Sequence, residues 1–193
     1  FLKHNIINPF SSNIPIKNVW HLASPASPKN YLKNPINTIR VNYEGTLNAL
    51  KLAKKNSSKF LFSSTSEIYG MTKNNPQFED MPISLSTFSP RACYSEAKRL
   101  AETVITTYSN IYKIETRIAR IFNTYGPRFD LDDGRVISTF INQSFLNQEL
   151  TIFGDGFQTR SFCYVEDLVD GLIKLMNSDY KYPLNLGNQE EIK

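Results

Sequence analysis

The chain has 193 residues, a formal net charge of +4, 40% hydrophobic residues and 12% aromatic residues. This length suits one packed domain, and the composition excludes a disordered chain, which would have few aromatic residues and a high net charge. Two cysteines exclude a disulfide framework, and no pairing of them with the two histidines has metal-ligand spacing, so we expect no metal site.

Targeting and charge patterns suggest an ordinary cytoplasmic protein. No apolar run approaches the length of about 18 residues that a membrane helix needs, and no charged segment followed by an apolar stretch opens the chain. We expect a cytoplasmic protein with no membrane segment in this chain. The basic residues are scattered, and their one cluster, at residues 51–59, is explained by a solvated helix end. We therefore expect no nucleic-acid partner, and the charge at most favours an anionic small molecule.

Strands and helices alternate along the sequence. Residues 18–23 are predicted to form a buried strand, which two prolines stop. Asn34 before Pro35 marks a helix start, and apolar residues three and four apart extend that helix to near Asn56. The other predicted elements are strands at 58–64, 114–122, 150–153 and 184–187 and helices from 89 through 108, at 136–146 and at 165–176. This order predicts a doubly wound α/β fold with a parallel sheet.

One expected motif of such a sheet does not occur. A dinucleotide-binding sheet usually opens with a strand, a Gly-x-Gly-x-x-Gly turn and a helix. The eight glycines all follow the first predicted strand and never have that spacing. We therefore expect the first strand–helix–strand unit to be missing and both ends of the chain to be cut.

The main candidate for chemistry is the pair Tyr94 and Lys98, which lie on one face of a helix because they are four residues apart. A nearby cation favours phenolate, so Lys98 would lower the pKa of Tyr94 and make it a general base toward a hydroxyl. The spacing alone is weak, since about 0.7 such pairs arise by chance and Tyr69 and Lys73 form another. The polar turn at residues 63–67 adds specificity, because ligands bind outside the carboxyl ends of parallel strands.

Seven segments between His21 and Asn188 resemble the extended short-chain dehydrogenase/reductase family, the NAD-dependent epimerases and dehydratases of nucleotide sugars. The segments are residues 21–28, 42–48, 65–70, 91–99, 117–128, 132–136 and 154–162. Within the family they are most similar to the UDP-glucuronate decarboxylases, although Ser95 and Ala97 stand where those enzymes usually have Asp and Gly.

The resemblance implies a fold and a reaction. Residues 1–129 would form the central part of an NAD-binding Rossmann-like domain, and residues 130–193 would mainly bind the nucleotide sugar, with elements that return to the first domain. The implied cofactor is NAD, the implied substrate is UDP-glucuronate, and a homodimer is implied for the full-length form. In the implied reaction C4 of the sugar is oxidised, the 4-keto sugar loses CO₂, and reduction at C4 gives UDP-xylose.

The same resemblance assigns residues to roles. Tyr94 would be the base, Lys98 would lower its pKa, Thr65 would hydrogen-bond the C4 oxygen, and Glu67 and Arg160 would flank the carboxylate and C5. The residues implied to bind the cofactor are His21, Leu22, Ala23, Asn42, Ser63, Ser64, Tyr94 and Lys98. The residues implied to bind the substrate are Ser66, Asn123, Arg128, Arg135 and Arg160.

Several alternatives stay open. Ser66 argues against the dTDP-glucose type of 4,6-dehydratase, which has an Asp there as its acid, but GDP-mannose-type dehydratases share Thr-Ser-Glu. Each of these residues also has a purely structural alternative to its functional role. These alternatives are a surface arginine for Arg160, salt bridges for Arg128 and Arg135, a core histidine for His21, a turn cap for Asn123 and a buried apolar residue for Cys93. A second hypothesis treats the chain as a catalytically silent fragment that binds a UDP-sugar weakly or pairs with a partner.

Overall fold

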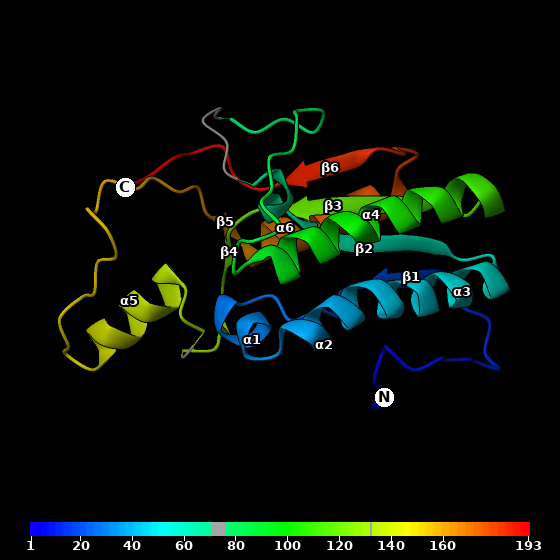
Figure 1. The fold of residues 1–193 in the computed structure, drawn as a ribbon, viewed down its shortest axis with the longest axis horizontal. Coiled ribbons are helices and arrows are strands. Elements are labelled where there is room, and N and C mark those ends of the chain that lie inside the picture. Colours follow the sequence, from blue (N-terminus) through cyan, green and yellow to red (C-terminus); the bar gives the residue numbers. More distant parts are fainter. Residues whose placement is uncertain (71–75, 132) are drawn as a thin grey trace.

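A computed structural model describes residues 1–70, 76–131 and 133–193. A four-stranded sheet in the order β1–β2–β3–β6 forms its centre, and all neighbouring strands are parallel (Figure 1). The strands are β1 (Asn18–His21), β2 (Lys59–Thr65), β3 (Thr116–Ile121) and β6 (Pro183–Leu186). With helices on both faces, the structure confirms the predicted doubly wound α/β fold.

The two faces of the sheet carry separate hydrophobic cores. Helices α3 (Thr46–Asn56) and α4 (Ala92–Tyr112) pack on one face, and α6 (Val165–Asn177) packs on the other. Side chains alternate along a strand, so Phe60 and Phe62 of β2 enter the core under α3 and α4, whereas Leu61 enters the core under α6. β2 is therefore buried on both faces, and this packing holds its carboxyl end, at Thr65, in place between α4 and α6.

The helix predicted from Asn34 to Asn56 forms over that range in three parts. These are α2 (Pro35–Arg40), the π-helical turn η1 (Val41–Gly45) and α3. Asn34 caps the start, because its Oδ1 accepts a hydrogen bond from the backbone N–H of Asn37 at 3.2 Å. A further short helix, α1 (Pro28–Lys33), was not predicted, since its prolines were interpreted only as the end of a strand.

The region after residue 122 differs most from the prediction. The strand expected at residues 150–153 is wrong: these residues are exposed and no strand lies beside them among the described residues. Side chains bond their backbone instead, since the Thr151 N–H donates to Gln143 Oε1 at 3.0 Å and Gln158 Nε2 donates to the Phe153 backbone oxygen at 2.9 Å. A two-stranded parallel sheet forms instead from β4 (Thr124–Tyr125) and β5 (Cys163–Tyr164). Helix α5 (Val136–Phe145) lies to one side of the sheet in Figure 1, whereas α6 and β6 return to it.

The described residues contain neither a membrane-spanning helix nor a cluster of metal ligands. No helix among them has the length and apolar character needed to cross a bilayer. Within residues 1–70, 76–131 and 133–193, no group of three or more His, Cys, Asp or Glu side chains is placed to hold a metal ion.

Candidate active site

The carboxyl end of β2 passes into a short 3-10 helix, η2 (Ser66–Tyr69). Thr65 begins this turn, because its Oγ1 accepts a hydrogen bond from the backbone N–H of Glu67 at 3.2 Å. Tyr94 lies in the first turn of α4 and is hydrogen-bonded to the Thr65 side chain. The structure therefore brings the predicted base together with the polar turn that follows the strand.

The ring of Tyr94 is held in a stack. It is 5% exposed and lies parallel to the ring of Tyr31, with centroids 4.8 Å apart and planes 3° apart. Burial raises the pKa of Tyr94 to about 12, although the hydrogen bond from Thr65 and the charge of Arg135 act in the opposite direction. The groups that lower this pKa are Thr65 and Arg135, and burial outweighs them; that Lys98 lowers it as well stays a prediction.

The amine of Lys98 is directed at the strand rather than at the phenol oxygen. Its Nζ donates a hydrogen bond to the backbone oxygen of Ser63 at 2.7 Å and lies 4.5 Å from the centroid of the Phe62 ring. The centroid of the Tyr94 ring is 5.9 Å away. Burial lowers the pKa of Lys98 to about 7, against the charge of Glu102, so amine and ammonium coexist near neutral pH.

Glu67 lies in the turn that follows Thr65 and forms an ion pair with Arg91. Its carboxylate accepts a hydrogen bond from Arg91 Nη2 at 3.1 Å, and Arg91 Nε donates to the Tyr31 hydroxyl at 2.6 Å. Burial raises the pKa of Glu67 despite this partner. A carboxyl group with a raised pKa can hold a proton closer to neutral pH than an ordinary one, which suits a proton-transfer role.

Sequence reasoning missed Tyr31 and Arg91, which connect Glu67 to the stacked tyrosines. A signal for Arg91 was present, because it stands three residues before Tyr94, where the last residues before a helix approach its first turn. Nothing in the sequence pointed to Tyr31, which reaches the site only through the unpredicted helix α1.

Two of the predicted cofactor residues are buried behind the end of β1. His21 Nε2 is hydrogen-bonded to Thr46 Oγ1 at 3.0 Å, and burial followed by the charge of Lys98 lowers the pKa of His21 to about 3. Asn42 is fully buried, and its amide bonds the backbone oxygen of Thr38 at 2.9 Å and the Ser24 hydroxyl at 3.0 Å. Both side chains have hydrogen-bond partners within the chain. For His21 this is the arrangement expected of a buried core histidine, the alternative to a cofactor-binding role.

Open space adjoins the residues that follow β1. A cavity of about 620 Å³ is lined by Ala23, Ser24, Val41 and residues 3–6. A smaller one of about 120 Å³ is bordered by His21, Leu22 and Ala23, among others. The larger volume is in the range of sites that hold cofactors, and it lies at the carboxyl edge of the sheet. Of the residues predicted to bind the cofactor, Ala23 thus borders the larger space, and His21, Leu22 and Ala23 border the smaller one.

The predicted serines are engaged with the chain itself. Ser63 Oγ donates to the backbone oxygen of His21 at 3.3 Å, and Ser64 Oγ donates to Glu102 at 2.5 Å. Ser66 is half-buried at the start of η2. Ser63 and Ser64 thus have partners within the chain, and Ser64 is the one of the three that is buried, whereas Ser63 and Ser66 are half-buried.

Of the predicted substrate arginines, Arg135 is the one whose charge affects the pKa values of Tyr94 and Glu67. It forms an ion pair with Asp133, its guanidinium lies 4.6 Å from the centroid of the Phe129 ring, and its charge lowers the pKa values of both Tyr94 and Glu67 against the effect of burial. The salt-bridge alternative is therefore realised at Arg135, and its charge also acts on Tyr94 and Glu67.

Other predicted substrate residues lie apart from the pocket. Arg160 is exposed, its Nη1 donates to the backbone oxygen of Thr159 at 2.7 Å, and its backbone pairs with Ile192. Asn123 is exposed and donates to the backbone oxygen of Ser161 at 3.4 Å. Arg128 is exposed with a backbone φ of 62°. Among the contacts of the described residues, none joins these three side chains to Tyr94 or Glu67; Lys73 and Asp132, also named from sequence, lie outside those residues.

The fold and the site together define a class of protein. A doubly wound parallel sheet with a buried Tyr–Lys pair beside a threonine at a strand end is the arrangement of a short-chain dehydrogenase/reductase. The model of the NAD dependent epimerase/dehydratase family matches residues 2–187, and the chain belongs to this family. The resemblance predicted from the sequence segments is confirmed.

Known proteins similar to the chain act on nucleotide sugars. UDP-glucuronic acid decarboxylase 1 of Xenopus tropicalis is 48% identical over 98% of this chain and 45% of its own length. The protein of the same name from Arabidopsis thaliana is 48% identical over 98% of this chain and 43% of its own length. A solved structure of UDP-N-acetylglucosamine 4-epimerase from Methanobrevibacter ruminantium M1, in complex with UDP-N-acetylmuramic acid, matches with a TM-score of 0.84 at 29% identity, over 91% of this chain and 56% of that one. The chain spans less than half the length of the two decarboxylases.

Proposed function

We propose that the chain is part of a UDP-glucuronate decarboxylase, which converts UDP-glucuronate to UDP-xylose and CO₂ with NAD recycled. The observation that carries this proposal is the meeting of Thr65, Glu67 and Tyr94 at the carboxyl end of β2, where the Thr65 side chain bonds both the Glu67 N–H and Tyr94. Identity of 48% to decarboxylases over 98% of the chain supports the choice of reaction.

The chemistry needs a proton to move at the C4 hydroxyl of the sugar. Tyr94 would take this proton, and Thr65 would hold the C4 oxygen while charge develops on it. NAD, when bound, supplies the hydride acceptor and a positively charged ring. The Thr65 side chain and the charge of Arg135 are the aids to ionisation that the chain itself provides, and the pKa of Tyr94 is about 12 with both of them in place.

Loss of CO₂ follows from the position of the carboxylate. Once C4 is a ketone, the carboxylate on C5 is β to it, and the electrons of the broken C–C bond delocalise into the keto oxygen. Glu67, whose pKa is raised by burial, would exchange a proton at C5. We assign Arg160 to the sugar carboxylate, which requires the exposed segment that carries it to approach the pocket.

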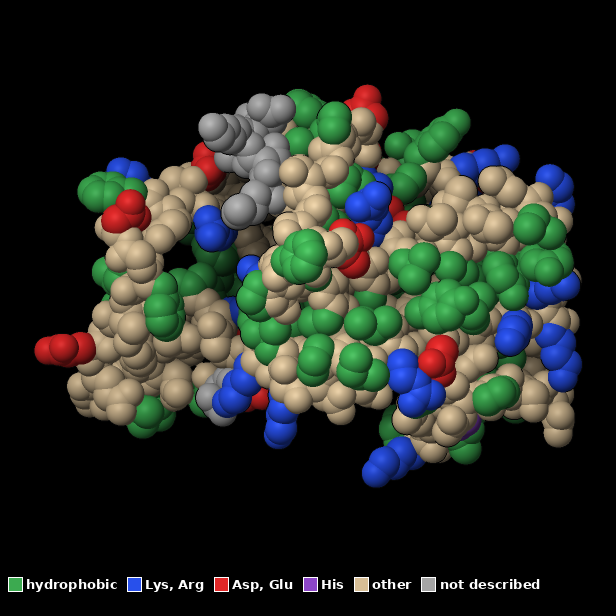
Figure 2. All heavy atoms as spheres, viewed as in Figure 1, with side chains coloured by type: hydrophobic (Ala, Val, Ile, Leu, Met, Phe, Trp, Pro, Cys, Tyr) green, Lys and Arg blue, Asp and Glu red, His purple; other side chains and the backbone are tan. Residues whose placement is uncertain are grey.

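The remaining parts of the proposal concern the larger assembly. We propose that residues 1–129 bind mainly NAD, that residues 130–193 contribute mainly to the nucleotide sugar, and that the full-length form is a homodimer. A hydrophobic area over α3 and α4 supports the homodimer (Figure 2). Exposed large hydrophobic residues on α2 to α4 and the turn between them are Ile36, Ile39, Tyr43, Leu100, Ile111 and Tyr112.

A product analysis tests the reaction. The longest polypeptide that carries this chain, supplied with NAD and UDP-glucuronate, is expected to release CO₂ and form UDP-xylose. A 6-deoxy-4-keto product from another nucleotide hexose, with no CO₂, would establish a dehydratase, and a C4 epimer would establish an epimerase such as the one the fold matches. The 193-residue chain is titrated with NAD in parallel, because micromolar binding would refute the silent-fragment hypothesis.

A further inference from the structure

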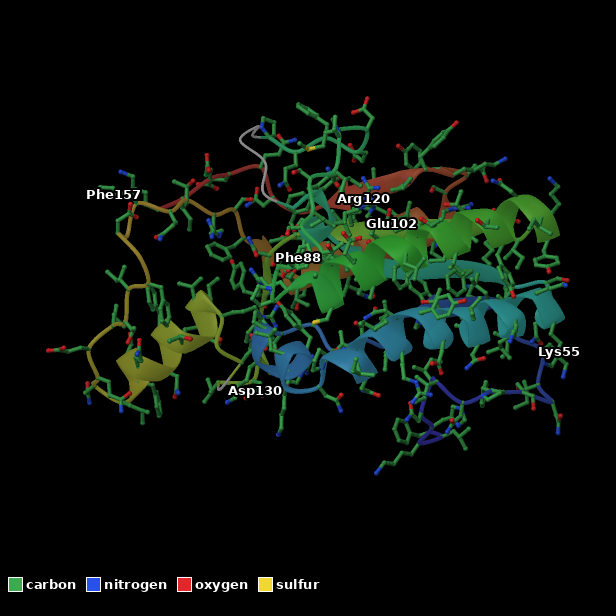
Figure 3. All side chains as sticks on the ribbon, in the orientation of Figure 1. Lys55, Phe88, Glu102, Arg120, Asp130 and Phe157 are labelled. Atoms are coloured by element: carbon green, nitrogen blue, oxygen red, sulfur yellow. The ribbon has the colours of Figure 1, made fainter. Side chains whose placement is uncertain are left out.

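Two charged side chains that the proposed reaction does not use, Glu102 of α4 and Arg120 of β3, form an ion pair inside the protein. They are 10% and 7% exposed, and Arg120 Nε and Nη2 donate to the two carboxylate oxygens of Glu102 at 3.1 and 2.9 Å. Figure 3 shows the two residues next to each other where α4 crosses the sheet. Buried ion pairs often add little stability compared with apolar residues of similar volume, so this pair calls for another explanation.

Glu102 follows Lys98 by four residues, as Lys98 follows Tyr94, so it lies one helical turn further along the same face of α4. Tyr94, Lys98 and Glu102 stand at every fourth position of α4, so they share one face. This face contacts three consecutive residues of β2. The bonds join Tyr94 with the Thr65 side chain, Lys98 Nζ with the Ser63 backbone oxygen at 2.7 Å, and Glu102 Oε1 with the Ser64 hydroxyl at 2.5 Å.

Arg120 fastens the turn that follows β2. It is the register partner of Ser64 in the parallel ladder, and its Nη1 donates to the hydroxyl of Tyr69 at 2.9 Å and to the backbone oxygen of Glu79 at 2.8 Å. Tyr69 is the last residue of η2, and its hydroxyl donates to Asn185 of β6 at 2.6 Å. One guanidinium of β3 thus connects Glu102 of α4 with Tyr69 of η2 and the backbone of Glu79.

We propose that the Glu102–Arg120 pair is a positioning device that holds residues 63–69 against α4, so that Thr65 and Glu67 face Tyr94. Neither residue touches the reacting atoms in this scheme; both act through the end of β2 and through Tyr69. The proposal rests on the proposed function for the roles of Thr65, Glu67 and Tyr94, whereas the bonds that carry it are independent of any substrate.

The pair also sets the charge environment of Lys98. The charge of Glu102 raises the pKa of Lys98 against the stronger effect of burial. The other titratable groups near the amine are Tyr94 on the same helix and His21 on β1, whose own pKa the charge of Lys98 lowers. Removing the charge of Glu102 should therefore move the pKa of Lys98 to below about 7.

The chain offers a matched control in the same strand. Arg117 is also a buried arginine of β3, but it bonds the backbone oxygen of Ser178 through Nε at 2.9 Å, away from the carboxyl end of β2. The variants are therefore Glu102→Gln, Arg120→Lys and Arg117→Lys. The readouts are the NMR titration of the Lys98 side chain and hydrogen exchange of the Glu67 and Gly70 amides, which bond Thr65 Oγ1 and the Glu67 backbone oxygen.

Each variant has its own expected result. Glu102→Gln should lower the titration midpoint of Lys98 by about one pH unit or more. Arg120→Lys keeps the cation but cannot keep all the bonds of a planar guanidinium, so it should leave that midpoint in place and speed exchange of the two amides by about tenfold or more. Arg117→Lys should change neither readout, even if it lowers the melting temperature as much.

The proposal is overturned if exchange of the Glu67 and Gly70 amides rises no more in Arg120→Lys than in Arg117→Lys. It is also overturned if a folded Glu102→Gln variant leaves the Lys98 midpoint unchanged. Should Glu102→Gln not fold, the two arginine variants alone decide. No step uses UDP-glucuronate, so an absence of decarboxylation together with the expected NMR results would refute the proposed function and support the positioning role.

Discussion

The end of β2 and the segment around Arg160 differ sharply in how the chain holds them. Thr65, Tyr94 and Lys98 are buried, and each has a partner within the chain. The segment at residues 150–160 is largely exposed, and Phe157, with 71% exposure, lies at the outer edge of the molecule in Figure 3. The sheet therefore fixes the groups proposed for chemistry, whereas a segment that the sheet does not fix carries the group proposed for the substrate carboxylate.

The largest effect that would test this contrast is the loss of the Tyr94 hydroxyl. Tyr94→Phe keeps the stacked ring but removes the proton acceptor, so turnover of UDP-glucuronate should fall by about 10² to 10⁴-fold, with substrate binding nearly unchanged. The turnover is measured as the rate of CO₂ release by the longest polypeptide that carries the chain. Tyr108→Phe, on the same helix, is the control and should keep full turnover. Unchanged turnover in Tyr94→Phe would remove Tyr94 from its proposed role.

Two phenylalanines measure how firmly each region is packed. Phe60→Ala empties a site in the core under α3 and α4, and should lower the free energy of unfolding by about 3 to 5 kcal/mol. Phe157→Ala, on the exposed segment, should change it by less than about 0.5 kcal/mol. Urea unfolding of the two variants compares them directly. Equal losses would show that the exposed segment is packed as tightly as the core.

Burial of His21 makes the free energy of unfolding depend on pH. The pKa of His21 is about 3 in the folded chain and 6.5 as an ordinary value, so the unfolded chain binds the extra proton between these values. Stability therefore rises with pH through this window, and the His21 contribution between pH 5 and pH 7 is about 2 kcal/mol. His21→Gln should flatten this part of the stability curve by that amount, measured by urea unfolding at several pH values.

The control for this prediction is the only other histidine, His4, which is exposed. His4→Gln should leave the slope between pH 5 and pH 7 as it is in the unchanged chain. An equal flattening in both variants would mean that the buried imidazole is not the source of the slope.

The smallest expected effect on stability is at Arg160. Arg160→Ala removes an exposed side chain, so the free energy of unfolding should change by less than about 0.5 kcal/mol. If the segment closes on the substrate, KM for UDP-glucuronate should rise by about tenfold, because a charge-assisted bond to the carboxylate is lost. An unchanged KM, with Arg135→Ala raising it instead, would assign the carboxylate to Arg135.

Much of the fold could be predicted because its signals are local. Asn34 with Pro35 marked a helix start, and apolar spacing carried that helix to Asn56. The strand at residues 150–153 could not be judged in this way, since a short apolar run becomes a strand only when another backbone pairs with it. The sheet of β4 and β5 was missed for the same reason, as its partners are about 40 residues apart.

The candidate site was predictable where it depends on spacing and not where it depends on contacts. Spacing put Lys98 one turn from Tyr94, but the position of its amine depends on the Ser63 backbone oxygen of another element. Arg120 could have been noticed as a charge between Ala119 and Ile121 in an apolar strand, which needs a buried partner. Its partner, Glu102, could have been found at the next step of the Tyr94 and Lys98 spacing.

By itself, the order of residues determined the family, the alternation of strands and helices, and the placing of Tyr94 and Lys98 on one helix face, because these follow from periodicity and from segments contiguous in the chain. Only the tertiary structure decided the protonation behaviour of the site. Burial raises the pKa of Tyr94 and lowers that of Lys98, and burial depends on how α1, α4 and β2 pack together. The tertiary structure likewise decided that the charge of Arg135 lowers the pKa of Glu67, whereas Arg160 bonds only its own segment. Residues distant in sequence influence one another only once the sheet and its loops are assembled.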